Sequence, residues 1–219
     1  MDVHLVSDTM LLVDFGQVID PAVNARAIAL GARLAAAAVP GVRDIVPAYC
    51  SVGVHIDPLL VDLVALEARI VAEAEAVLGE PVAPDRPPVE IPVHYGGEAG
   101  PDLELLAAHA GLSTAEVIER HAARLYRVYM LGFVPGFAYM GGVDPAIAAP
   151  RHRVPRERVP AGSVGIAGEQ TGIYPIATPG GWQIIGRTDL AVFDPSRDPA
   201  CLLAPGDRVR FVPVPGGAR

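Results

Sequence analysis

The sequence predicts an α+β protein of two domains, a small N-terminal domain with the β-α-β-β-α-β order of a ferredoxin-like split unit and a C-terminal domain of many short strands. Two observations predict this. Strand-like and helical apolar patterns alternate in the first part of the chain, and short β-like runs separated by Gly and Pro dominate the second. A proline-rich stretch at 80–88 lies between them. The domains are therefore expected at 1–86 and 87–219.

In the N-terminal domain, residues 10–15 predict a strand that ends at Gly16. Asp20-Pro21 then begins a helix that runs to about Val39, because Asp caps a helix N-terminus and Pro fits the first turn. Strands follow at 43–48 and 50–56, and Asp57-Pro58 is expected to begin a second helix that ends at Gly79. A strand at 89–94 either closes this sheet or opens the next domain.

In the C-terminal domain, Gly100-Pro101-Asp102 begins a short helix that ends at Gly111, and Ser113 with Glu116 forms a capping box for a helix to about Arg124. Pro179-Gly180-Gly181 predicts the turn of a hairpin. The predicted strands are short and closely spaced, which indicates a closed barrel or a sandwich. They lie at 126–134, 163–167, 173–177, 182–187, 190–193 and 207–213.

The basic residues exclude several kinds of chemistry. All 17 residues counted as Lys or Arg are Arg. The chain therefore has no lysine for a Schiff base, a P-loop or biotin attachment. Residues 1–86 carry a net charge of −7 and residues 87–219 a net charge of −1, out of −8 for the chain. A nearly neutral, Arg-rich second domain suits a site for a small anion better than a nucleic-acid surface.

The remaining composition indicates a soluble protein of the cytoplasm. The first residues form no secretory signal, and no apolar run is long enough to span a membrane. Cys50 and Cys201 allow a disulfide, but two free thiols in a reducing cytosol are the favoured interpretation. The six His show no paired metal-ligand spacing, so no metal site is predicted.

Two segments stand out as candidate binding sites. Residues 132–142 hold Phe133, Phe137 and Tyr139 between Pro/Gly turns. This pattern fits either an aromatic wall beside a ligand or a plug in a barrel end. Residues 151–158 contain four Arg braced by prolines, which fits either anion binding by guanidinium groups or a solvated loop.

Other residues allow competing interpretations. Residues 161–168 nearly match a nucleophile elbow, but a strand rather than a helix follows, so Ser163 is taken as a turn-and-strand residue. Trp182 is expected to anchor the core. His121, on the helix after the capping box, is the best candidate general acid or base, although a core or surface His is the alternative. Residues expected to line one face of the predicted hairpin are Gln170, Thr171, Gln183, Arg187 and Thr188.

Six motifs of the chain are specific when they occur together: His94-Tyr95-Gly96-Gly97-Glu98, Gly132-Phe133-Val134-Pro135-Gly136-Phe137, Val159-Pro160-Ala161-Gly162-Ser163-Val164, Gln170-Thr171-Gly172-Ile173-Tyr174-Pro175, Pro179-Gly180-Gly181-Trp182 and Gly186-Arg187-Thr188. Through them the chain resembles the family of the B-type 5-oxoprolinase subunits, also called allophanate hydrolase subunit 1, which includes a sporulation kinase inhibitor. Looser matches are Val13-Asp14-Phe15-Gly16 and Val46-Pro47-Ala48-Tyr49. Ala138, Met140 and His152 depart from the family pattern, where Pro, Leu and Arg would be expected.

The resemblance implies a cyclophilin-like β-barrel for the C-terminal domain. It also implies a heteromeric complex with the C-type 5-oxoprolinase subunit, which has a related cyclophilin-like barrel, and with the A-type 5-oxoprolinase subunit. That complex is expected to hydrolyse 5-oxoproline to glutamate with ATP, supplied with magnesium through the complex. Alternatives are an allophanate or urea-type amidohydrolase subunit, an inhibitor of a sensor histidine kinase, and a proline isomerase suggested by the barrel alone.

For this chemistry, His121 or Glu169 is expected to move protons, while Arg187 with Arg151 and Arg156 holds anions. Glycine-rich turns would add backbone N–H donors. We therefore expect that Arg187→Ala abolishes most activity of the complex. The residues expected to bind substrate or nucleotide are Phe133, Phe137, Tyr139, Arg151, Arg156, Gln170, Thr171, Tyr174, Gly180, Gly181 and Thr188.

Overall fold

The computed structural model describes residues 1–79 and 87–214. Contacts group the chain into two compact units, Met1–Pro84 and Asp85–Arg219, and each unit is described by itself. The predicted boundary after residue 86 adjoins a segment outside the described residues, so it stays a prediction. Cys50 and Cys201 are both free thiols.

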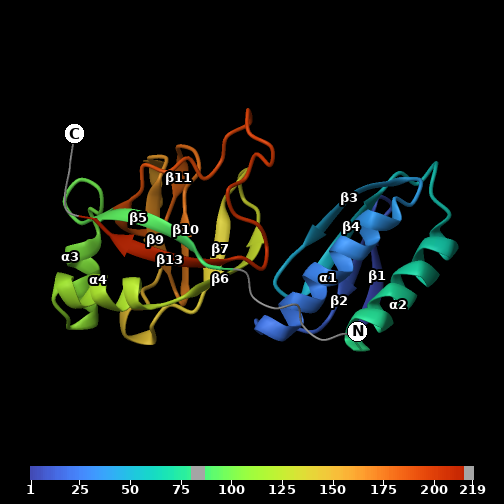
Figure 1. The fold of residues 1–219 in the computed structure, drawn as a ribbon, viewed down its shortest axis with the longest axis horizontal. Helices are drawn as coiled ribbons and strands as arrows, with labels where there is room; N and C mark the ends of the chain where they lie inside the picture. The colour runs from blue at the N-terminus through green and yellow to red at the C-terminus, as the bar shows by residue number, and fades with distance from the viewer. Residues whose placement is uncertain (80–86, 215–219) are drawn as a thin grey trace. The chain divides into compact units, whose positions relative to one another are not determined.

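The N-terminal unit contains a four-stranded sheet with the order β1-β2-β4-β3, in which all neighbours are antiparallel (Figure 1). The alternation of β2 and β4 buries Leu11, Val13, Val52 and Val54 on the side that packs on the helices. The strands are β1 (Asp2–Ser7), β2 (Met10–Asp14), β3 (Val42–Pro47) and β4 (Ser51–Ile56).

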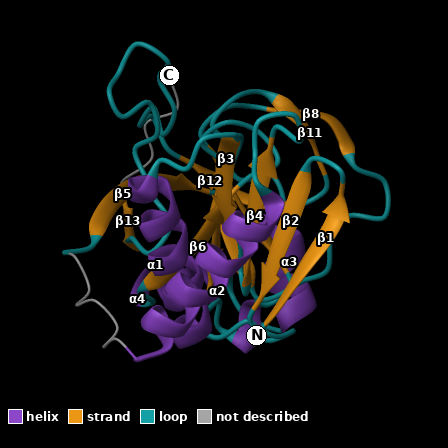
Figure 2. Cartoon of the chain, turned by 90° about the vertical axis from the view of Figure 1, so that its right-hand side faces the viewer, coloured by secondary structure: helices purple, strands orange, loops and turns teal. Residues whose placement is uncertain are grey.

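Helices α1 (Pro21–Ala37) and α2 (Leu63–Gly79) lie side by side over this sheet (Figures 1 and 2). The Asp20 carboxylate accepts the Ala22 N–H at 2.8 Å and the Val23 N–H at 3.0 Å, so the predicted N-cap is confirmed. The expected start of α2 at Asp57 is wrong. Asp57 instead closes a turn by accepting the Leu59 N–H and pairing with Arg43.

The expected ferredoxin-like unit is not confirmed, because the element order of this unit is β-β-α-β-β-α. The strand predicted at 89–94 is β5 (Val89–Tyr95), and it pairs with a strand of the second unit. The place beside β2 is taken by β1, which the sequence did not reveal. Five of the six residues of this edge strand are exposed, so it lacks the apolar alternation by which strands are recognised.

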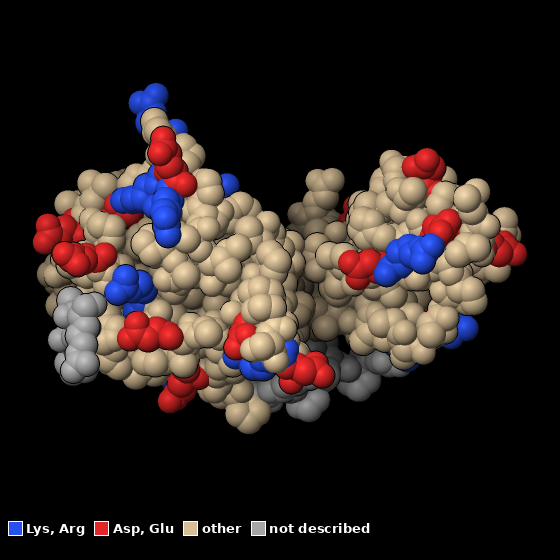
Figure 3. Space-filling view, turned by 90° about the horizontal axis from the view of Figure 1, so that it is seen from above, with Lys and Arg blue, Asp and Glu red and all other residues tan. Residues whose placement is uncertain are grey.

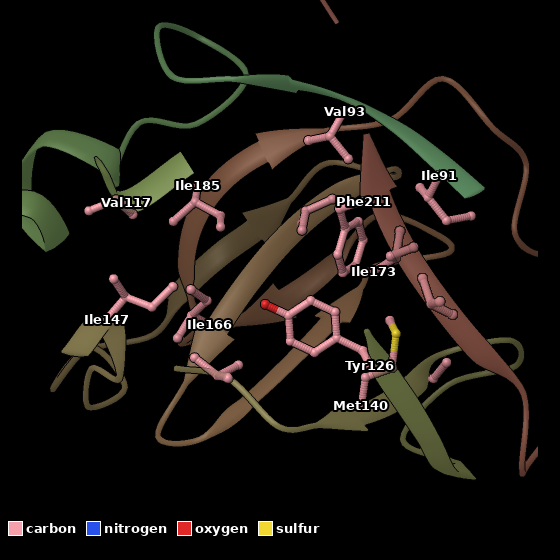
Figure 4. Packing of buried hydrophobic residues seen from close by; sticks show 14 of the residues in the cluster. Ile91, Val93, Val117, Tyr126, Met140, Ile147, Ile166, Ile173, Ile185 and Phe211 are labelled. Atoms are coloured by element: carbon pink, nitrogen blue, oxygen red, sulfur yellow. The ribbon is translucent and has the colours of Figure 1, made fainter. Parts of the chain in front are cut away.

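The second unit is built on a closed barrel with the strand order β10-β7-β6-β13-β5-β12-β9, which confirms the predicted barrel. Its interior is filled by apolar side chains that include Tyr126, Ile166, Ile173 and Phe211 (Figure 4). Besides β5, the barrel strands are β6 (Tyr126–Leu131), β7 (Ala138–Gly141), β9 (Ser163–Ala167), β10 (Gln170–Ile173), β12 (Gln183–Arg187) and β13 (Arg208–Pro213).

Helices α3 (Leu103–Ala110) and α4 (Thr114–Ala123) pack on β12 and β13, and a short 3₁₀ helix, η1 (Pro145–Ile147), lies beside them. The capping box of Ser113 and Glu116 is confirmed. Gly111 ends α3 at a φ of +67°, a conformation that costs glycine little. None of the described helices is both long enough and apolar enough to cross a membrane.

A two-stranded sheet of β8 (Arg156–Val159) and β11 (Thr178–Gly180) lies outside the barrel. Together with the segment 150–155 that leads into β8, we call it the flap. The expected hairpin across Pro179-Gly180-Gly181 is wrong, because β11 pairs with β8 and not with β12. The strand expected at 190–193 is only a single bridge between Phe193 and Cys201, and 173–177 is strand only at Ile173.

Candidate anion-binding site

Aromatic rings gather between the flap and the barrel, around the buried ring of Phe137. Ring-centre distances from Phe137 are 5.7 Å to Phe133, 4.8 Å to Tyr139, 5.2 Å to Tyr174 and 5.4 Å to Trp182, all edge to face. Edge-to-face contacts of this kind add stability beyond the buried area. The cluster is separate from the barrel interior, and Trp182 is buried in it as expected.

Phe133 stands apart from the other rings because it is exposed. The residue is 60% exposed, and its backbone φ is +67°, a left-handed conformation that residues other than Gly rarely adopt. The turn is held by a bond from the Val134 N–H to the Gly132 carbonyl at 2.8 Å. Strained residues that persist are enriched at functional sites.

Arg151 lies over the outer side of this cluster. Its guanidinium carbon is 5.9 Å from the centre of the Trp182 ring, within the range of a cation–π contact. Burial raises the pKa values of the Tyr139 and Tyr174 hydroxyls, and the charge of Arg151 opposes that rise at both. The guanidinium therefore stands close to two phenol groups.

The buried carboxylate of Asp102 joins the flap to the barrel. Its Oδ1 accepts from Arg156 Nη2 at 2.5 Å, and its Oδ2 accepts from the Ile184 backbone N–H at 2.6 Å. His152 Nε2 lies 3.2 Å from Oδ2, at ion-pair distance. Burial acts to raise the pKa of Asp102, but these hydrogen bonds outweigh it and hold the pKa below its usual value.

Several buried polar atoms near Asp102 have no hydrogen-bond partner among the described residues. They include Arg156 Nη1 and Gln183 Oε1. The Gln183 amide nitrogen donates to the Pro150 carbonyl at 2.9 Å, which fixes the orientation of that side chain. Buried polar atoms without partners are uncommon in folded proteins. Their presence here indicates a place that a small ligand or a partner would complete.

We call Asp102, Arg151, Arg156, Tyr174 and Trp182 the arginine corner. Gly180 belongs with it, because a Cβ at that position would fall 2.4 Å from the Tyr174 hydroxyl. Sequence reasoning missed Asp102, whose position at the start of α3 looks like an ordinary helix cap. The predicted binding residues that the structure brings together here are Phe133, Phe137, Tyr139, Arg151, Arg156, Tyr174, Gly180 and Gly181.

His121 lies elsewhere, packed on Phe211 with a ring-centre distance of 4.6 Å. It is fully buried. Its Nδ1 is 2.7 Å from the Tyr95 hydroxyl, and its Nε2 is 3.0 Å from the Thr171 hydroxyl. Thr171 donates its own proton to the Gly165 carbonyl, so Nε2–H must donate to Thr171 and Nδ1 must accept from Tyr95.

The environment of His121 keeps its ring neutral, because burial lowers its pKa to about 3. Both ring nitrogens are occupied by the hydrogen bonds with Tyr95 and Thr171. This is the alternative of a satisfied core histidine that the sequence left open. A role in proton transfer stays a prediction.

The other predicted residues are not among those that form the arginine corner. Glu169 is exposed in the turn between β9 and β10, and Gln170 pairs with Gly141 and Ala167 at the start of β10. Arg187 ends β12 opposite Ser163 and His94, about 13 Å of strand from Gln183. The Thr188 hydroxyl is buried and accepts the Leu190 N–H. Their expected roles stay predictions.

Charges on the surface are mixed. On the face drawn in Figure 3, arginine side chains lie beside acidic ones and form no broad basic area. Nucleic-acid surfaces are recognised by clustered basic side chains, so this face does not have their character.

The fold and the corner define a class: α/β proteins in which a sheet unit precedes, in the sequence, a closed barrel that forms an arginine and aromatic site together with a two-stranded flap. The chain belongs to the family described as carboxyltransferase domain, subdomain C and D, whose model matches residues 1–203.

Within that family, the chain is similar to the B-type 5-oxoprolinase subunits, which confirms the resemblance found in its motifs. It is 44% identical to the one from Bacillus subtilis, over 97% of this chain and 92% of the relative. It is 43% identical to the one from Escherichia coli O157:H7, over 98% and 96%. The solved structure of TTHA0988 matches with a TM-score of 0.83 and 42% identity, over 95% of this chain and 40% of that one.

Proposed function

We propose that this chain is the B-type member of a 5-oxoprolinase complex, which opens the lactam of 5-oxoproline to glutamate with ATP. The observation that carries the proposal is the 44% identity over nearly the whole length of both this chain and the B-type 5-oxoprolinase subunit from Bacillus subtilis. The proposed setting is the cytoplasm, with A-type and C-type subunits as partners.

The chemistry requires activation of a poor electrophile. A lactam is stabilised by amide resonance, and water alone attacks it slowly. ATP supplies the activation by phosphorylating the lactam oxygen, which weakens the C–N bond toward attack by water. The task of this chain is to bind and orient the anionic substrate, for which charge-assisted hydrogen bonds from arginine are well suited.

The arginine corner supports this role. Arg151 presents an exposed guanidinium beside the Tyr139 and Tyr174 hydroxyls. Asp102 ties the flap to α3 and β12 through hydrogen bonds at 2.5 and 2.6 Å. A site held by buried hydrogen bonds loses little freedom on binding, so its groups are already placed for the substrate.

The test is reconstitution of the complex. This chain is co-expressed with candidate A-type and C-type proteins from the same source, and glutamate release from 5-oxoproline is measured with and without ATP. Allophanate is assayed alongside. We expect ATP-dependent glutamate release that disappears when this chain is left out.

Two results would contradict the proposal. One is turnover that does not change when this chain is omitted. The other is a stable three-part complex that releases ammonia from allophanate and no glutamate from 5-oxoproline. Recovery of a histidine kinase in place of a C-type partner would favour a kinase inhibitor. Prolyl isomerase activity of the isolated chain would favour a proline isomerase.

A further inference from the structure

We infer that the arginine corner binds the single carboxylate of its substrate through Arg151, and that it does not bind the polyphosphate of a nucleotide. The inference rests on the proposed function where it names 5-oxoproline as that carboxylate. It divides the two anions of the reaction, placing the substrate on this chain and the nucleotide elsewhere in the complex.

The net charge of the arginine corner matches a single carboxylate. Arg151 and Arg156 are the two guanidinium groups whose charges act on the Tyr174 hydroxyl. The carboxylate of Asp102 takes up the charge of Arg156 through a direct hydrogen bond. Among the five residues of the arginine corner, this leaves one net positive charge, carried by Arg151. One positive charge matches one carboxylate.

The placement of Arg151 also suits a carboxylate. Its guanidinium is exposed and lies over the Trp182 ring, at 5.9 Å from the ring centre. Stacking on an aromatic face leaves the edge N–H groups of the fork available to a planar acceptor. A carboxylate accepts two such bonds in parallel. The nearby phenol group of Tyr174 can donate to the same anion or to the lactam carbonyl.

The arginine corner lacks the features that bind a polyphosphate. Polyphosphates are bound by helix N-termini, glycine-rich loops and several cations together. The helix that begins at this corner is α3, and its N-terminus already carries Asp102 at the cap and Glu104 in the first turn. A polyphosphate would meet these two carboxylates with one unpaired arginine to offset them.

The experiment uses Trp182, the only tryptophan of the chain, as a reporter. Its fluorescence is followed while the full chain is titrated with 5-oxoproline, with 2-pyrrolidinone, which has the same lactam without the carboxylate, and with Mg-ATP. Calorimetry gives a second reading of the same binding. The variants are Arg151→Gln and, as a matched control, Arg153→Gln, an exposed arginine two residues along the same segment.

We expect saturable binding of 5-oxoproline to the wild-type chain. Because Arg151→Gln loses a hydrogen-bonded charge pair with the substrate, its affinity should be about 10- to 100-fold weaker, while the affinity of Arg153→Gln should be unchanged. We expect 2-pyrrolidinone to bind the wild-type chain no more tightly than 5-oxoproline binds Arg151→Gln. We expect Mg-ATP not to compete with 5-oxoproline for the wild-type chain. The inference would be overturned if Arg151→Gln bound 5-oxoproline as tightly as the wild-type chain does. It would also be overturned if Mg-ATP competed with 5-oxoproline for the wild-type chain and this competition disappeared in Arg151→Gln. The absence of 5-oxoproline binding by both the chain and the reconstituted complex would overturn it as well.

The two proposals fail separately. A complex that turns over 5-oxoproline with the same KM in Arg151→Gln refutes the inference and leaves the function standing. A complex without such turnover, whose B-type chain still binds a monocarboxylate through Arg151, refutes the function and leaves the inference standing.

Discussion

Two polar networks of the barrel unit differ in one decisive respect. In the His121 network, Tyr95, His121, Thr171 and the Gly165 carbonyl form a closed chain in which each hydrogen-bonding group has a partner. At the arginine corner, Arg156 Nη1 and Gln183 Oε1 lack partners among the described residues, and the Arg151 guanidinium is exposed.

This difference in hydrogen-bond satisfaction indicates different roles for the two networks. A fully satisfied buried network fixes one conformation and leaves nothing for a ligand to bind. A network with one unpaired donor and one unpaired acceptor beside an exposed cation has binding capacity left. On this ground we propose that the His121 network has a structural role and that the arginine corner binds the substrate.

Among changes in the two polar networks, His121→Leu is expected to have the largest effect on stability. The change removes the acceptor of the buried Tyr95 hydroxyl and the donor to Thr171. We expect the free energy of unfolding to fall by about 2–4 kcal/mol. Urea unfolding followed by Trp182 fluorescence measures this, with exposed His109→Leu as the control. A loss no larger than that of the control would refute a structural role.

The His121 network should also make the free energy of unfolding depend on pH. His121 has a folded pKa of about 3, below the usual value of 6.5. The unfolded chain therefore takes up a proton more readily than the folded one between these values. Stability from the neutral ring is complete above pH 6.5 and is lost as the pH falls toward 3, by up to about 1.4 kcal/mol per pH unit.

Urea titrations at several pH values between 4 and 7 test this dependence. The slope of the unfolding free energy against pH should be shallower in His121→Leu than in the wild type. Parallel slopes in the two proteins would show that His121 is charged in the folded chain or exposed to water.

Asp102→Asn tests the corner. It keeps the shape of the side chain but leaves Arg156 without its counter-charge, so we expect a loss of about 1–3 kcal/mol at pH 7. Because the folded pKa of Asp102 is lowered, its contribution is present above about pH 4 and disappears as the pH falls further. The gap between wild type and variant should close in acid, and a constant gap would contradict the ion pair. Exposed Glu157→Gln is the control.

Phe133→Gly is expected to change the stability of the protein least. Glycine adopts the observed φ of +67° without strain, and the lost ring is exposed, so the unfolding free energy should stay within about 1 kcal/mol of wild type. Buried Phe137→Ala should instead cost about 3–5 kcal/mol. A large destabilisation by Phe133→Gly would show that the ring is part of the core and not a wall for a ligand.

Local patterns predicted the parts of the molecule that are decided locally. The Asp20 cap and the Ser113–Glu116 capping box were found because they depend on residues three or fewer positions apart. The aromatic and Arg members of the corner were found because Gly and Pro turns mark their segments.

Pairings between distant segments were not predictable in this way. Asp102 contacts Arg156, 54 residues away, and the Ile184 N–H, 82 residues away, and no local pattern reports such contacts. The pairing of β11 with β8 was missed because a Pro-Gly-Gly turn looks like a hairpin whichever strand is the neighbour. Arg187 was grouped with Arg151 and Arg156 by residue type, whereas β12 places it at its far end.

The most direct test of the central claim compares Arg151→Gln with Arg187→Gln in the reconstituted complex, with the KM for 5-oxoproline and the KM for ATP measured in each. The account predicts a KM for 5-oxoproline raised about 10- to 100-fold in Arg151→Gln alone, with the KM for ATP unchanged in both variants. A wild-type KM for 5-oxoproline in Arg151→Gln together with a large loss of activity in Arg187→Gln would contradict it.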